Sequence, residues 1–301
     1  MSTQYDNAPS SGQALLQEGQ ELLARGDRTG AAQVLARARA EKDVVLQAHA
    51  LIEQHGLVGS FTNMMGLECR ISAHDDIFGF FAGHPSSMNP LRDYFADGWR
   101  TLSELLVLLE AVDQPLLKMN HVLEFASGHG RFTRHLVKAL GASRVTVSDV
   151  VADAVDFSRA TFGVQGFPSA SVPEDVQWPR QYDLVFVLSL FSHLPRHTWT
   201  RWLQALHGAV APGGVLVFST HGQKAADFDH VTLEDDGYFF APSSESQAID
   251  VHEYGTAFTA EPFVLADRED VGPWRAGAPS ASALLEPPGR LCAAQTMSLH
   301  Q

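Results

Sequence analysis

The run from residue 122 to residue 131 constrains the fold of this chain more than any other, and it reads Val-Leu-Glu-Phe-Ala-Ser-Gly-His-Gly-Arg. Its apolar start predicts the end of a buried strand with Glu124 at the carboxyl end, and a helix is expected from about Arg131. The residues between them are small: Ala126, Ser127, Gly128 and Gly130. Backbone approaches a ligand closely only where side chains are small, and a helix N-terminus offers unpaired N–H groups to an anion. This turn therefore predicts a site for a small ligand with an anionic end above a sheet.

A repeating pattern surrounds this run. Strand-like segments are expected at 121–125, 144–148, 164–167, 183–189 and 214–220, and helices at 131–140, 152–161 and 198–209. Two more strands are expected near 253–265 and 291–298. Strands that alternate with helices predict a parallel sheet with right-handed crossovers. Residues 119–301 are therefore expected to form an α/β domain with a Rossmann-like, seven-stranded, mostly parallel sheet.

The first part of the chain has a different pattern. Residues 1–12 are polar and small, so we expect a disordered tail. Residues 13–118 are expected to form a helical extension and cap that starts with a hairpin similar to a single tetratricopeptide unit. The hairpin is expected to pack on the main domain or on a partner subunit, which allows a homo-oligomer; a peptide-binding repeat is the alternative. Glycines and prolines at 74–100 predict broken helix there, and its aromatic residues are either core under a loop or a cap over a pocket, with helix resuming over 101–112.

The composition of the chain argues against several classes of binding partner. The net charge of −14 argues against a nucleic-acid backbone and against an anionic membrane surface as the main partner. No apolar stretch reaches the roughly 18 residues that a membrane span requires. Two cysteines and no signal-like N-terminus make a disulfide framework unexpected, so a cytoplasmic protein is predicted.

Asp149 ends the second expected strand and lies 21 positions after Gly128. Nucleoside-binding α/β folds place an acidic residue that binds ribose hydroxyls at about this spacing. The alternative role is a surface cap for the helix at 152–161, because aspartate is favoured at that position. The order of strand, loop, helix, strand and acid favours ribose binding.

The loop departs from the dinucleotide pattern, because Thr133 stands where the third glycine is expected. An acid followed by small residues at alternate positions resembles instead the first motif of the class I S-adenosylmethionine-dependent methyltransferases, with Ala126 in place of the usual first glycine. The resemblance covers roughly 120–222 and continues with Asp149, with Tyr-Asp-Leu-Val-Phe-Val-Leu-Ser at 182–189, and with Pro-Gly-Gly at 212–214. It implies S-adenosylmethionine as the cofactor. The cofactor-binding residues it implies are Glu124, Ala126, Ser127, Gly128, Gly130, Asp149, Val150, Ser169, Ala170, Ser189, Leu190, Tyr94 and Gly98.

The reaction that the resemblance implies mainly requires the acceptor atom, the methyl carbon and the sulfur to lie in line. It needs a base only for some acceptors. His193 and His221 follow the fourth and fifth strands and are the candidate bases, although a single histidine in such a place is more often a hydrogen-bonded structural residue. The ligands of metal-dependent members are missing after these strands, so metal independence is expected. The tetrapeptide of members that methylate exocyclic amines is also missing, which favours a small-molecule or glycan-like acceptor. Its candidate contacts are Tyr238, Ser244 and Glu245.

The expected function is transfer of a methyl group to an oxygen, or in second place a nitrogen, of a small metabolite or sugar-like acceptor. Two alternatives remain open. One is a non-catalytic scaffold that keeps the fold for binding, and the other is a nicotinamide-dependent oxidoreductase, which Thr133 argues against.

Overall fold

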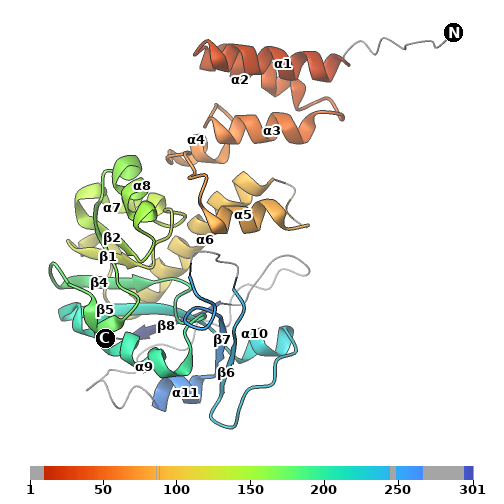
Figure 1. Cartoon of the computed structure of the whole chain (residues 1–301). Helices are drawn as coiled ribbons and strands as arrows, with labels where there is room; N and C mark the ends of the chain where they lie inside the picture. Colours follow the sequence, from red (N-terminus) through yellow and green to blue (C-terminus); the bar gives the residue numbers. More distant parts are fainter. Residues whose placement is uncertain (1–9, 86, 88, 245–248, 267–294, 301) are drawn as a thin grey trace. The chain divides into compact units, whose positions relative to one another are not determined.

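The computed structural model describes residues 10–85, 87, 89–244, 249–266 and 295–300 of the 301, the last segment as backbone only. The chain divides into two compact units, each described by itself (Figure 1). The first comprises residues 1–71 and 78–97, and the second comprises 72–77 and 98–301.

Helices make up the described part of the first unit. They are α1 (Ser11–Ala24), α2 (Arg28–Ala38), α3 (Val45–Gln54), α4 (Phe61–Met65), most of α5 (Asp76–Gly83) and the start of α6 (Pro90–Ala111). Helix α1 begins inside the tail that was expected to be disordered, because the Ser10 hydroxyl caps it by accepting a hydrogen bond from Gln13 N–H. Asp27 caps α2 in the same way through Gly30 N–H, so the two helices form the expected hairpin.

Helix α6 corrects the prediction of broken helix over 74–100. It begins at Pro90 and continues through Gly98 instead of starting near residue 101. Proline is tolerated in the first turn of a helix, where its missing N–H has no partner to lose. At Gly98 a Cβ atom would lie 2.5 Å from the carbonyl oxygen of Arg131, so glycine serves close packing in the second unit. The turn residues of this segment therefore have packing roles and do not all end helices.

A six-stranded sheet forms the centre of the second unit, in the order β3-β2-β1-β4-β5-β8. The strands are β1 (Val122–Phe125), β2 (Val145–Asp149), β3 (Gln165–Pro168), β4 (Tyr182–Val187), β5 (Val210–His221) and β8 (Gln295–His300). The first five are parallel, and β8 runs antiparallel to β5. The α/β fold with a mostly parallel sheet is thus confirmed, while the described residues add no seventh strand to this sheet.

The strand expected near 253–265 is shorter and lies outside the large sheet. It is β7 (Thr256–Thr259), which pairs antiparallel with β6 (Tyr238–Ala241) in a separate two-stranded sheet. Ala257 N–H bonds the carbonyl oxygen of Ser192, so β7 joins the loop after β4 rather than the edge of the large sheet.

Alternating side chains of the buried strands fill two cores. Val122, Leu184 and Phe186 belong to one cluster, and Leu123 and Val185 belong to the other. A strand buried on both faces shows this near-continuous apolar pattern. The helices of this unit are the rest of α6, α7 (Thr133–Leu140), α8 (Ala152–Phe162), α9 (Arg196–Gly208), α10 (Gln223–Phe228) and α11 (Glu261–Ala266), with short 3-10 turns at Leu116–Lys118, Ala142–Arg144 and Pro173–Asp175.

The chain order reverses between β1 and β4, which lie side by side although two strands separate them in sequence. Open parallel sheets bind ligands outside the carboxyl ends of their strands at such a point. Of the helices in the described part of the chain, none combines the length and apolarity needed to cross a membrane.

Candidate functional site

A cavity of about 590 Å³ opens at the carboxyl ends of the parallel strands, entirely within the second unit. Its volume lies within the range typical of small-molecule sites. The loops after β1, β2, β3 and β4 all contribute to its wall. Ten of the residues predicted to bind the cofactor line it: Glu124, Ala126, Ser127, Gly128, Asp149, Val150, Ser169, Ala170, Ser189 and Leu190.

The turn after β1 owes its shape to left-handed backbone. Ala126 has φ of 56° and Gly128 has φ of 53°, a conformation that costs an L side chain energy. A Cβ atom on Gly128 would meet nothing within 4 Å, whereas on Gly130 it would lie 2.3 Å from the Phe162 ring. Gly130 does not line the cavity. It therefore serves the packing of the turn on α8, and Gly128 leaves space on the cavity side.

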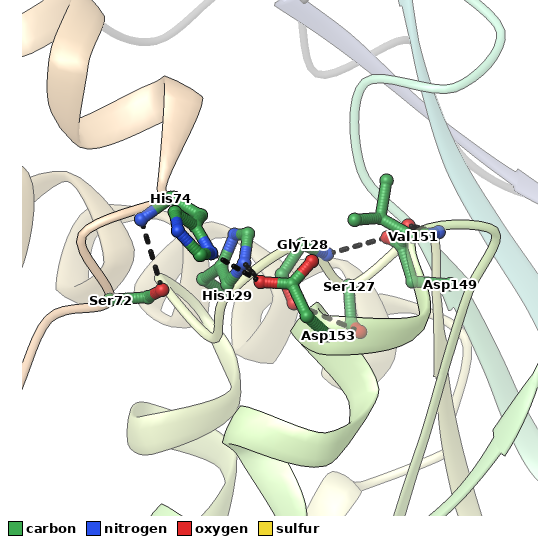
Figure 2. A network of polar contacts seen from close by, with 8 residues as sticks. All are labelled: Ser72, His74, Ser127, Gly128, His129, Asp149, Val151 and Asp153. Carbon is green, nitrogen blue, oxygen red and sulfur yellow. Dashed lines mark hydrogen bonds and ion pairs between the residues drawn. The ribbon is translucent and has the colours of Figure 1, made fainter. Parts of the chain in front are cut away.

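Asp149 at the end of β2 is held by backbone. Its Oδ2 accepts a hydrogen bond of 2.8 Å from Gly128 N–H, and its Oδ1 accepts one of 2.9 Å from Val151 N–H (Figure 2). Burial raises the pKa of this carboxyl, while the backbone donors oppose the rise by stabilising the charged form. A carboxylate has about four lone-pair sites, so the backbone donors leave it acceptor capacity for a ligand. The carboxylate thus connects the turn after β1 to the end of β2 and still offers acceptors to the cavity.

Glu124 is a second buried acid in the cavity wall, with an exposed fraction of 2%. Its Oε2 accepts a hydrogen bond of 2.7 Å from the Thr133 hydroxyl. Burial, with a further contribution from the negative charge of Asp149, raises the pKa of Glu124 to about 8 against the opposing effects of Thr133 and Arg134. A cation in the cavity would reverse this preference for the neutral form.

One carboxylate at the cavity rim connects three segments. Asp153 Oδ2 lies 3.0 Å from His74 Nδ1 and 3.1 Å from His129 Nε2, and Figure 2 shows both rings directed at it. These hydrogen bonds lower the pKa of Asp153. The segment 72–77, the turn after β1 and helix α8 are thereby tied together around the cavity, which all three help to line.

In the loop after β4, His193 packs against Tyr254. Their rings stack with centroids 4.3 Å apart and an angle of 14° between planes. His193 Nδ1 lies 2.6 Å from the carbonyl oxygen of Gly255, which only accepts, so this nitrogen carries the proton. Tyr254 lines the cavity next to Ser189, and its hydroxyl donates to the Ser189 carbonyl oxygen at 3.3 Å.

The remaining predicted residues do not line this cavity. His193 and His221 lie outside its wall, with ring centroids 6.1 Å apart, and His221 also contacts Phe258. Tyr238 is buried and donates its hydroxyl to the Leu194 carbonyl oxygen. Ser244 and Gly98 are also outside the wall, Tyr94 is a buried residue of the first unit, and Glu245 lies outside the described residues.

Sequence reasoning missed three residues of this site. Thr133 counts in the sequence analysis only as a departure from the dinucleotide pattern. A hydroxyl nine positions after a buried acid could have indicated its hydrogen bond to Glu124. Asp153 and Tyr254 lie in a helix and in a turn whose sequences carry no motif. Among the described residues, no three histidine, cysteine or acidic side chains gather in a way that suits a metal ion.

Residues 123–216 match the family model of a methyltransferase domain. None of the curated proteins is similar enough in sequence to match this chain. Similar solved structures include the DhpI-SAM-HEP complex, with 18% identity over 77% of this chain and 100% of that chain and a TM-score of 0.43. The glycopeptide N-methyltransferase MtfA has 14% identity over 69% and 90%, with a TM-score of 0.46. The magnesium protoporphyrin IX methyltransferase ChlM from Synechocystis PCC 6803, with bound SAH, has 13% identity over 75% and 91%, with a TM-score of 0.45.

At these identities and TM-scores, no residue role and no acceptor carries over from those structures to this chain. The match of residues 123–216 to a methyltransferase domain bears out the resemblance to S-adenosylmethionine-dependent methyltransferases and the predicted enzyme class.

Proposed function

We propose that this protein transfers a methyl group from S-adenosylmethionine to an oxygen, or in second place a nitrogen, of a small metabolite or sugar-like acceptor, without a metal ion. The observation that carries the proposal is Asp149, held by Gly128 N–H and Val151 N–H in the wall of the cavity at the carboxyl ends of the strands. The bond from Gly128 N–H connects the carboxylate that would bind the ribose with the turn of small residues.

The residues of the cavity fit such a cofactor at both of its ends. Asp149 has acceptor capacity left for the ribose hydroxyls after its bonds to the backbone. Glu124 is buried beside the turn after β1 and accepts an ammonium group there. The open space at Gly128 lets the ligand approach the backbone, and the segment from Ser169 to Ala170 lies in the wall where the adenine is expected.

S-adenosylmethionine supplies a methyl group on a positively charged sulfur when it is bound. The work of the chain is then to align the acceptor with that methyl group in a cavity that excludes water. Ser189 and Leu190 form the wall at the methionine end. His193 and His221 stay the candidate bases; from their positions behind the wall, either needs a water or a movement of Tyr254 to reach an acceptor.

The negative charge of the cavity wall favours a neutral or basic acceptor. The cavity wall contains Asp75, Asp76, Asp153 and Glu253 in addition to the two acids assigned to the cofactor, and Arg131 is its one arginine or lysine in the described chain. Carboxylates near a site disfavour anionic ligands and accept hydrogen bonds from hydroxyl or amine groups.

Calorimetric titration with S-adenosylmethionine and S-adenosylhomocysteine tests the cofactor assignment. We expect both to bind, and we expect D149N to weaken both by about tenfold or more, because the amide turns its NH2 group toward one of the two backbone N–H groups, Gly128 or Val151, and loses the charged acceptors. The matched control is D156N, which changes an exposed aspartate of α8 and should bind both ligands like the wild type. Absence of binding at millimolar concentration would refute the proposal.

The two alternatives are separated by other readouts. A scaffold would bind the cofactor without transferring its methyl group to any member of a broad acceptor panel. An oxidoreductase would show a change in NADH fluorescence on titration. Thr133, which bonds Glu124 where a third glycine would stand, disfavours the oxidoreductase.

A further inference from the structure

We infer that Tyr254 recognises the positively charged sulfur and methyl group of the methyl donor and so separates donor from product. Tyr254 has no role in the sequence motifs, yet it lines the cavity together with Ser189 and Leu190. The inference rests on the proposed function, because it takes the methionine end of the donor to lie beside those two residues.

The turn that bears Tyr254 is firmly built. Asp250 accepts hydrogen bonds from the backbone N–H groups of Glu253 and Tyr254 through its carbonyl oxygen, and from His252 N–H through its carboxylate. At Gly255 a Cβ atom would lie 2.3 Å from the carbonyl oxygen of Ala241, so only glycine fits at this position. These contacts therefore hold the backbone at 250–255 in one conformation.

Contacts with the loop after β4 fix the ring itself. Gly255 N–H bonds the carbonyl oxygen of His193 at 2.9 Å, and the His193 ring stacks against Tyr254 and donates back to the Gly255 carbonyl. His193 covers one face of the phenol ring, so a ligand in the cavity can reach only the opposite face or the edge of the ring.

The tyrosine hydroxyl also shapes the wall at this end. It donates to the carbonyl oxygen of Ser189, a residue in the left-handed conformation with φ of 63°. Ser189 N–H is held in turn by the Ser219 hydroxyl at 2.8 Å. The ring and the backbone oxygen of Ser189 thus lie next to each other at one place in the wall.

An aromatic face and a carbonyl oxygen share a preference for cations. A ligand cation over a tyrosine ring is attracted by the negative face of the ring, and a carbonyl oxygen adds a partial negative charge. The donor carries a positive charge on its sulfur, and the demethylated product has a neutral thioether there. Tyr254 is therefore placed to bind the donor more tightly than the product, and to hold the methyl group toward the acceptor.

The test compares the dissociation constants of S-adenosylmethionine and S-adenosylhomocysteine for the full-length wild type, Y254L and Y254F. We expect Y254L to weaken binding of the donor about three- to tenfold while binding of the product changes less than about twofold, since only the donor loses a cation–π contact. Y254F keeps the ring and should keep the wild-type ratio within about twofold. Exposed Phe228 lies outside the cavity wall, so F228L is the control and should leave both constants unchanged.

Binding of the product reports that each variant is folded, so the ratio is readable without a known acceptor. An equal loss for both ligands in Y254L, or no change for either, would overturn the role of Tyr254 while leaving the proposed function intact. Failure of the wild type to bind either ligand would instead refute the proposed function and this inference with it.

Discussion

Replacing Glu124 by glutamine should stabilise the protein without ligand, and more so at high pH. Burial and the charge of Asp149 raise the pKa of Glu124 from 4.5 to about 8, so the folded state holds this proton more tightly than the unfolded state. The stability that the bound proton contributes is complete below about pH 4.5 and is lost as the pH rises through about 8. Because one pKa unit corresponds to about 1.4 kcal/mol, ionisation costs the folded state on the order of 3 kcal/mol more at pH 8 than at pH 5.

Glutamine removes that cost, since it has no charge and its carbonyl oxygen still accepts the hydrogen bond of the Thr133 hydroxyl. Urea unfolding of wild type and E124Q at pH 5, 6.5 and 8 gives the difference in free energy of unfolding at each pH. We expect this difference to grow by on the order of 3 kcal/mol from pH 5 to pH 8. The control is E110Q, which removes the same side-chain carboxyl at an exposed position of α6. Parallel pH profiles for wild type and E124Q would refute the assignment of a buried, proton-holding carboxyl at this position.

Three substitutions in the turn after β1 should separate stability from binding. G130A should cost about 2 kcal/mol or more of unfolding free energy, because its Cβ would meet the Phe162 ring in a left-handed backbone; an unchanged melting temperature would contradict the packing role. G128A should cost only about 1 kcal/mol, since its Cβ meets open space, yet weaken binding of S-adenosylhomocysteine by about tenfold; equal binding in calorimetry would show that the ligand does not approach there. A126G should raise the free energy of unfolding by roughly 0.5 kcal/mol, because it relieves the strain at φ of 56° while the greater freedom of glycine in the unfolded chain offsets part of that gain. A clear loss of stability on thermal unfolding would count against that strain.

The sequence predicted the centre of the molecule well because local patterns determine it. Strands buried on both faces appear as apolar runs, and small residues followed by a helix mark the turn after β1. These signals located Glu124, Gly128 and Asp149, and all three line one cavity. Ala126 in the place of a glycine was noticed, but its left-handed backbone is visible only in the structure.

The parts that were missed depend on contacts between segments far apart in sequence. Tyr254 reaches the cavity because β7 docks on the loop after β4, and no pattern within 249–260 indicates that pairing. His193 was expected near the acceptor from its place after β4, and stacking on Tyr254 puts it behind the wall. The sequence predicts that Gly98 breaks a helix or binds the cofactor, whereas its neighbours in space, Arg131 and His135, explain why it is glycine.

The measurement that tests the central claim most directly follows the labelled methyl group of S-adenosylmethionine in the presence of the full chain and a panel of small hydroxyl and amine acceptors, including sugars and aminosugars. The account predicts that the label moves to an acceptor oxygen, or in second place to a nitrogen, and that D149N slows this transfer strongly while D156N does not. Label that stays on a cofactor bound by the wild type, across the whole panel, would contradict the assignment of a methyltransferase and favour the scaffold.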